Sequence, residues 1–133
     1  MRKYDLHDFH YDFPNEDAAF DYVLALKKPP VKMYRRKNTK SYSTSKGEYY
    51  APLKGTIFEN VKLDLDVWFL AVFLIHYNEY WSIKDFKDRL KVNYVTAFRI
   101  LKKIRPEIDR SKTFTLNLDR MIMGKYIRRK VDN

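Results

Sequence analysis

The sequence predicts a mainly α-helical protein with a small β component. Apolar residues recur at helical spacing in several stretches, whereas short alternation of polar and aromatic residues is confined to a few others. The predicted order is an N-terminal helix, a cysteine-free ribbon-like β-hairpin, a three-helix unit with a helix-turn-helix, and a C-terminal strand and tail. We divide the chain accordingly into residues 1–54, 55–108 and 109–133.

The N-terminal section contains one predicted helix. The first dozen residues are aromatic and acidic without a clear period, so we expect surface polar residues there, with His7 and His10 not forming a metal site. A helix then opens at residues 13–17, where acids fill its first turn, and ends at residues 27–30, where lysines precede two prolines. Its candidates for burial are Ala19, Phe20, Val23, Leu24 and Leu26.

Residues 31–53 predict a basic β-hairpin. Polar and aromatic residues alternate over residues 40–44 and 48–51, with Gly47 between, which is typical of two short strands joined by a turn. An isolated hairpin is marginal in water, so this one needs a neighbour or a ligand to pack against. Its basic side chains either track a phosphate backbone or are simply solvated. They are Lys32, Arg35, Arg36, Lys37, Lys40, Lys46 and Lys54.

The middle section begins with a connector at residues 55–60 and a helix over residues 67–75. Acidic residues at Asp64 and Asp66 precede this helix, and apolar residues occupy every side of it. A helix that is apolar all round is buried, so we expect residues 67–75 to form the central core helix.

Residues 82–105 predict a helix-turn-helix. Ser82 and Asn93 can each cap the helix that follows, and only Lys91, Val92 and Asn93 connect the two helices. The first helix has an inward face of Ile83, Phe86 and Leu90. The second has an inward stripe of Ala97, Leu101 and Ile104, with Phe98 beside it. Its outer side carries Tyr94, Thr96, Arg99, Lys102 and Lys103, for which a solvated charged face is the alternative explanation.

The C-terminal section predicts a strand over residues 113–118, because apolar and polar residues alternate there up to Asp119. The basic tail at residues 124–130 is either a partner strand or an arm.

Composition indicates a polyanionic partner. The 133 residues carry a net charge of +10, and this charge lies in blocks: residues 27–54 hold nine basic and one acidic side chain, and residues 82–108 hold eight and three. The absence of cysteine excludes disulfides and thiolate metal sites. Neither a secretory signal nor a membrane span is expected, so we predict an intracellular protein without a membrane partner, in the cytoplasm and nucleoid of a bacterium or the nucleus of a eukaryote.

Three blocks occur in a distinctive order. They are Phe-Pro-Asn-Glu-Asp-Ala-Ala at residues 13–19, Gly-Thr-Ile-Phe-Glu at 55–59 leading to Trp-Phe-Leu-Ala at 68–71, and Thr-Ala-Phe-Arg-Ile-Leu at 96–101. This order resembles the N-terminal region of Merlin-type insertion-sequence transposases, which have a zinc ribbon, a helix-turn-helix and a three-carboxylate (DDE) catalytic domain. The resemblance covers nearly the whole chain and implies recognition of transposon-end DNA.

The chain departs from that family at its metal sites. The resemblance places Lys32 and Arg35 on the first Cys-x-x-Cys knuckle and Ser43 and Lys46 on the second, so all four thiolates are missing. Lys and Arg do not bind zinc at neutral pH, and we expect neither a metal nor another cofactor. Asp119 resembles the first catalytic carboxylate, but two-metal chemistry needs several. We therefore expect no enzyme activity unless the chain is a fragment of a longer transposase.

The leading expectation is a double-stranded DNA-binding protein whose helix 93–105 enters the major groove. Tyr94 and Arg99 would meet base edges, while phosphates would be held by Asn93, Thr96, Lys102, Lys103, Lys32, Arg35 and Lys46. Such a protein would repress transposition, regulate transcription or act as a domesticated accessory factor, in an oligomeric state that the sequence leaves open. The alternative is a protein- or RNA-interaction module that uses residues 31–54, with Tyr42, Tyr49 or Tyr50 stacking on bases.

Overall fold

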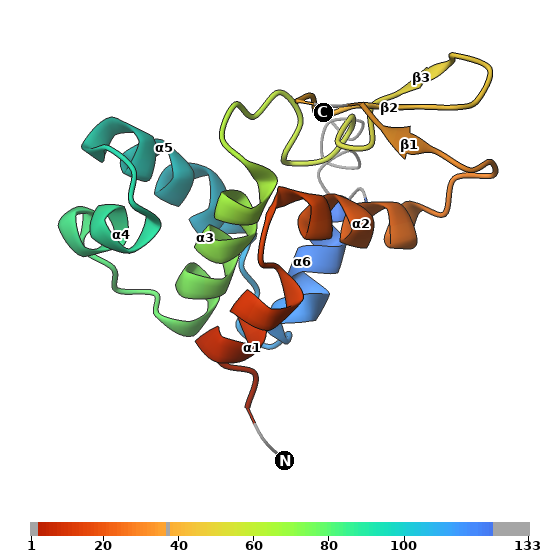
Figure 1. The fold of residues 1–133 in the computed structure, drawn as a ribbon. Helices are drawn as coiled ribbons and strands as arrows, with labels where there is room; N and C mark the ends of the chain where they lie inside the picture. The colour runs from red at the N-terminus through yellow and green to blue at the C-terminus, as the bar shows by residue number, and fades with distance from the viewer. Residues whose placement is uncertain (1–2, 37, 124–133) are drawn as a thin grey trace, which may run out of the picture.

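The computed structural model describes residues 3–36 and 38–123, and within them the predicted class is confirmed (Figure 1). The helices are α1 (Leu6–Asp12), α2 (Glu16–Lys27), α3 (Leu65–Tyr77), α4 (Ile83–Leu90), α5 (Tyr94–Ile104), the short 3-10 helix η1 (Arg105–Glu107) and α6 (Phe114–Ile122). The strands are β1 (Tyr34–Arg35), β2 (Tyr42–Ser43) and β3 (Tyr49–Tyr50). None of the helices in the described ranges combines the length and apolarity needed to cross a bilayer.

Helix α3 lies at the centre of the molecule, as predicted. It packs against α4 and α5 on one side and against α2 and α6 on the other (Figure 1). Apolar side chains all round α3 are therefore covered from both sides, and Phe69 and Ile75 are completely buried. One hydrophobic cluster joins α3 to Phe20 of α2 and Leu118 of α6, so residues from all three predicted sections share a core.

Helix α1 lies in the N-terminal stretch where the sequence showed no clear period. Asp5 and Asp8 form a reciprocal capping box, in which the Asp8 backbone N–H donates to Asp5 Oδ1 and the Asp5 backbone N–H donates to Asp8 Oδ2, both at 3.0 Å. The helix that follows buries Phe9, whose ring contacts those of Phe73 and Phe114. Two turns with a single buried residue show too little periodicity for the sequence to reveal a helix.

Helix α2 begins and ends where the sequence predicted. The Asn15 side chain accepts a hydrogen bond from the Ala18 backbone N–H at 2.9 Å and so caps the first turn. Lys28 adopts a left-handed conformation, with φ of 47°, and Pro29 follows it, so the helix cannot continue.

The sheet has three strands instead of the predicted two. β2 and β3 form the expected hairpin, and β1 pairs antiparallel with the other edge of β2. β1 is only two residues long and lacks alternation, which explains why the sequence did not reveal it. The central strand packs on the core through Tyr42, whose ring lies 6.0 Å from that of Phe20.

The predicted strand at residues 113–118 is wrong, because the segment forms α6. Thr113 caps this helix by accepting a hydrogen bond from the Leu116 backbone N–H at 3.2 Å. The apparent alternation hides a helical period that extends past residue 119, since Phe114, Leu118 and Met121 are buried while Leu116 is 49% exposed. The predicted tail at residues 124–130 lies outside the described residues.

Asn117 of α6 is a fully buried polar residue that joins three parts of the fold. Its Oδ1 accepts from the Asp109 backbone N–H (3.1 Å) and from Arg120 Nη1 (2.8 Å), and its Nδ2 donates to the Asp109 carbonyl (3.1 Å) and lies 3.0 Å from His76 Nδ1 of α3. Burial, followed by the positive charges of Arg110 and Lys3, lowers the pKa of His76. A neutral His76 can accept the fourth bond, so the amide is fully satisfied.

We predict that Asn117→Ala lowers the free energy of unfolding by about 1–3 kcal/mol, because the fully buried amide is lost and the part-buried Asp109 backbone and His76 ring lose their hydrogen-bond partner. Urea unfolding followed by tryptophan fluorescence measures this change. Thr115→Ala, an exposed substitution on the same helix, should stay within about 0.5 kcal/mol of the parent. Equal losses in the two variants would contradict a structural role for the Asn117 amide.

Candidate nucleic-acid interface

Helices α4 and α5 form the predicted helix-turn-helix. The Ser82 side chain accepts from the Asp85 backbone N–H at 3.1 Å, and the Asn93 side chain accepts from the Thr96 backbone N–H at 2.8 Å, so both predicted caps are present. Lys91 ends α4 in a left-handed conformation, with φ of 59°, which turns the chain sharply into α5.

The inward face of α5 differs from the prediction at two positions. Ala97, Leu101 and Ile104 are buried as expected, but Ile100 completes the stripe. Phe98, which the sequence placed beside that stripe, is 48% exposed. The apolar character of Phe98 suggested burial, whereas its position on the helix points it away from α3 and α4.

The outer side of α5 forms a continuous exposed surface, which we call the α5 face. It consists of Tyr94, Val95, Phe98, Arg99 and Lys102. Their spacing of one, three and four residues places them along one side of the helix. The surface therefore combines two cations with exposed apolar and aromatic side chains. Val95 and Phe98 were not among the residues that the sequence predicted for this surface.

The other predicted contacts on this helix lie at its border. Thr96 is half-buried, and its backbone N–H is held by the Asn93 cap. Lys103 is also half-buried, with its Nζ atom 5.8 Å from the centre of the Trp68 ring. Asn93 itself is exposed at the start of α5. On this helix the exposed predicted residues are thus Asn93, Tyr94, Arg99 and Lys102.

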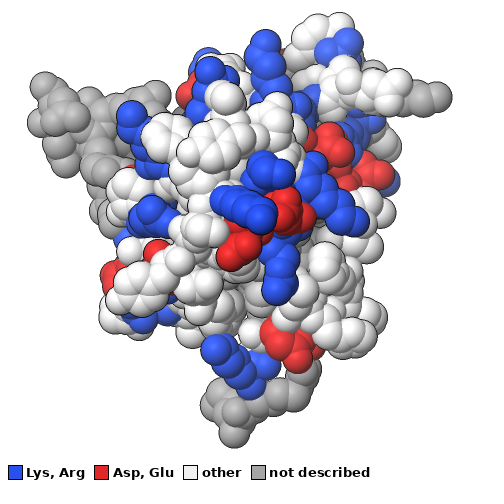
Figure 2. Space-filling view, turned by 90° about the vertical axis from the view of Figure 1, so that its left-hand side faces the viewer, with Lys and Arg blue, Asp and Glu red and all other residues white. Residues whose placement is uncertain are grey.

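Helix α4 contributes charges of both signs. It carries Lys84, Lys87 and Arg89 beside Asp85 and Asp88, and Lys87 Nζ lies 3.0 Å from the Asp88 carboxylate. Figure 2 views the side of the molecule that carries α4 and α5 in Figure 1 and shows basic side chains over much of it, with acidic ones gathered in a few patches. Lys84 and Arg89 of α4 are exposed, as are Arg99 and Lys102 of α5, so both helices present cations on this side of the molecule.

Lys32 and Lys46, two of the predicted phosphate contacts on the sheet, are exposed. Lys32 precedes β1, with its Nζ atom 5.5 Å from the centre of the Tyr34 ring, and Lys46 lies in the turn between β2 and β3. In Figure 1 the sheet lies on the opposite side of α3 from α4 and α5. These lysines and the α5 face are therefore separate surfaces.

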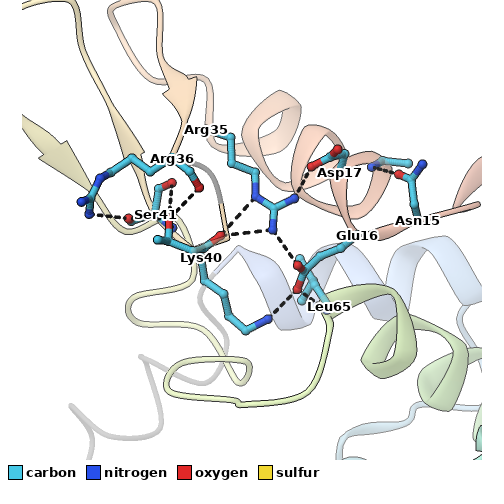
Figure 3. Close-up of polar contacts among 10 residues, drawn as sticks. Asn15, Glu16, Asp17, Arg35, Arg36, Lys40, Ser41 and Leu65 are labelled. Atoms are coloured by element: carbon cyan, nitrogen blue, oxygen red, sulfur yellow. Dashed lines mark hydrogen bonds and ion pairs between the residues drawn. The ribbon is translucent and has the colours of Figure 1, made fainter.

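Arg35, the third predicted phosphate contact on the sheet, is already hydrogen-bonded to other groups of the protein. Its guanidinium donates to Glu16 at 2.6 Å, to Asp17, and to the Thr39 carbonyl at 3.1 and 3.2 Å (Figure 3). The two carboxylates belong to the first turn of α2. The prediction that Arg35 contacts phosphate does not fit this geometry, because its donors already serve α2 and the β1–β2 loop.

Glu16 is the centre of this ion-pair cluster (Figure 3). Its carboxylate accepts from Arg35, from Lys40 Nζ at 2.5 Å and from the Leu65 backbone N–H at 2.9 Å. Burial would raise the pKa of Glu16, but the hydrogen bonds from Lys40, Leu65 and Arg35 outweigh it, so the pKa lies below its usual value. The cluster fixes the sheet to α2 and to the first turn of α3.

Asp119 lies within α6 and not at the end of a strand. Its Oδ1 atom accepts a hydrogen bond from the Tyr22 hydroxyl of α2, and burial together with this carboxylate raises the pKa of Tyr22. No three His, Cys, Asp or Glu side chains come together as a metal site within residues 3–36 and 38–123. In this fold, Asp119 connects two helices.

We predict that Glu16→Gln lowers the free energy of unfolding by about 1–3 kcal/mol at pH 7, because Arg35 and Lys40 lose a shared carboxylate. The folded state lowers the pKa of Glu16 from its ordinary 4.5, so its contribution is complete above that pH and is lost as the pH falls through the lower folded value. The difference between parent and variant should therefore shrink below pH 4.5 in urea titrations. A difference that is constant with pH would contradict the ion-pair explanation.

Asp17→Asn provides the matched control. Asp17 also contacts Arg35, but its side chain is 75% exposed, compared with 18% for Glu16. Exposed ion pairs contribute little, so this variant should lose less than about 1 kcal/mol.

Comparisons with protein-family models, curated proteins and solved structures find no match for this chain. The resemblance seen in the sequence therefore stays an expectation.

Proposed function

We propose that this protein binds double-stranded DNA by inserting α5 into the major groove. The observation that carries the proposal is the α5 face, where Arg99 and Lys102 lie on the same side of the helix as Tyr94, Val95 and Phe98. The major groove is about 12 Å wide and admits one α-helix, which fits a helix whose other side is buried against α3 and α4.

The helix order supports this arrangement. In a helix-turn-helix the second helix contacts base edges while the first crosses the phosphate backbone. Here α5 is the second helix. Helix α4 carries Lys84 in its first turn and Lys87 and Arg89 in its last turn. The N-caps at Ser82 and Asn93 and the short turn fix α5 relative to α4. The α5 face is therefore preorganised for binding.

Each side chain of the α5 face suits a different part of a duplex. The Arg99 guanidinium matches the O6 and N7 acceptors of guanine, and Val95 and Phe98 can contact thymine methyl groups. The Tyr94 hydroxyl can donate to a base edge or a phosphate, and Lys102 supplies charge to a phosphate. Asn93, Thr96 and Lys103 lie at the border of the face, next to the phosphates that flank such a contact.

A merely solvated charged surface is the simpler explanation, but the exposed apolar residues argue against it. Val95 is 55% exposed and Phe98 is 48% exposed, directly beside two cations. Exposed apolar groups rimmed by polar ones mark contact surfaces. We propose a binding role without catalysis, exerted where chromosomal DNA is found, as a repressor, a transcriptional regulator or an accessory factor of transposition.

We predict that Arg99→Ala removes sequence preference before it removes affinity. Duplexes selected from a random pool should bind the variant about 1–3 kcal/mol more weakly, because one bidentate base contact is lost, while scrambled duplexes should change little. Titrations of both duplexes at several salt concentrations measure the two effects. An Arg99→Ala variant with unchanged affinity and unchanged preference would show that α5 is only a scaffold.

Lys102→Ala is the matched control on the same face. A phosphate contact carries no sequence information, so selected and scrambled duplexes should weaken equally. The slope of log K against log salt should flatten by about one unit. Both side chains are exposed, so neither variant should lose its fold, which circular dichroism can verify.

A further inference from the structure

A second surface on the far side of the molecule has a different chemistry. An open groove of about 520 Å³ lies between the end of α2, the β1–β2 loop and β3. Among the described residues, its lining contains three cations and two tyrosines and no carboxylate: Lys27, Arg36, Ser41, Tyr49, Tyr50, Ala51 and Lys54. We call it the tyrosine groove. The larger groove nearby shares Arg36 but is also lined by the carboxylates of Glu16, Asp17 and Asp21, and the first two of these are paired with Arg35.

The aromatic part of the tyrosine groove is exposed and held in place. Tyr49 of the edge strand β3 is 72% exposed, and the Arg36 guanidinium carbon lies 4.3 Å from the centre of its ring. Arg36 also donates to the Ser41 hydroxyl at 3.3 Å, which anchors the guanidinium to the residue immediately before β2. Tyr50 is half-buried at the base of the groove, where burial raises its pKa. The Tyr49 ring is thus positioned without being covered.

The cationic part of the groove favours an anion. Lys27 Nζ donates to the Lys54 carbonyl at 3.3 Å, which brings the end of α2 against the segment after β3. Burial lowers the pKa of Lys27, even though Glu59 acts in the opposite direction. A phosphate in the groove would offset the cost of burying this ammonium, and Arg36 and Lys54 lie around the same space.

We propose that the tyrosine groove binds one or two nucleotides of unpaired, single-stranded nucleic acid. A base would stack on Tyr49, and Lys27, Arg36 and Lys54 would hold its phosphates, which is the combination that single-strand-binding proteins use. A duplex offers phosphates but no open base face to an exposed ring, so the tyrosines specify unpaired bases. The site lies across α3 from the α5 face and does not depend on duplex binding (Figure 1).

The test measures fluorescence anisotropy with labelled ten-nucleotide strands: oligo-dT, oligo-rU, an abasic strand with the same phosphates, and a blunt duplex. Tyr49→Ala should weaken oligo-dT or oligo-rU binding about 5- to 150-fold, the range expected for one lost base stack. Tyr49→Phe keeps the ring and should bind within about 2-fold of the parent. The comparison of dT with rU identifies which nucleic acid the groove prefers.

Three controls make the result decisive. Tyr49→Ala should not alter binding of the abasic strand, Arg99→Ala should leave oligo-dT and oligo-rU binding unchanged, and Lys54→Gln should flatten the salt slope for single strands. The proposal is overturned if base-containing strands bind no better than the abasic strand, or if Tyr49→Phe loses as much as Tyr49→Ala. It is also overturned if Tyr49→Ala weakens the duplex equally, because the groove would then be a contact for duplex phosphates.

Discussion

The Glu16 carboxylate holds three parts of the chain in place, and both candidate surfaces depend on the arrangement it sets. It binds Arg35 at the end of β1, Lys40 in the following loop and the backbone at the start of α3. Two-residue strands cannot form a stable sheet alone, so this sheet exists because charge and the buried Tyr42 fix it to α2. Where the resemblance would place a zinc-binding cysteine, the protein has an arginine bound to two carboxylates.

Helix α3 connects the part of the molecule that carries the sheet with the part that carries the helix-turn-helix. Its buried residues contact α2 and α6 on one side and α4 and α5 on the other, so the angle of the helix-turn-helix is set by packing and not by a flexible linker. Packing of this kind resists small displacements, because interiors are filled to crystal-like density. The α5 face is therefore presented by a rigid support, which the proposed contact with base edges would require.

Local signals in the sequence predicted most of the helices, because caps and apolar spacing act within a few residues. Ser82, Asn93 and the lysines before Pro29 show this. The strand predicted before Asp119 was wrong because six residues that alternate between apolar and polar also fit a helix. The helical period becomes visible only when Met121 and Ile122 are included. The sequence could not predict the ion pair of Arg35 with Glu16 or the hydrogen bond from Lys27 to the Lys54 carbonyl. Both contacts join residues that are distant in the chain.

If both proposed surfaces bind nucleic acid, their positions on opposite sides of α3 would give the molecule the geometry of a bivalent tether. Consider a nucleic acid that has a duplex and an unpaired segment at a suitable distance from each other. Once one of these parts is bound, binding of the other part to the second surface would be an intramolecular step. Effective concentrations in such cases reach the millimolar range, so two individually weak contacts can combine into an avidity about 10²- to 10⁴-fold above either alone. The protein would then distinguish nucleic acids by the distance between their paired and unpaired parts as well as by sequence.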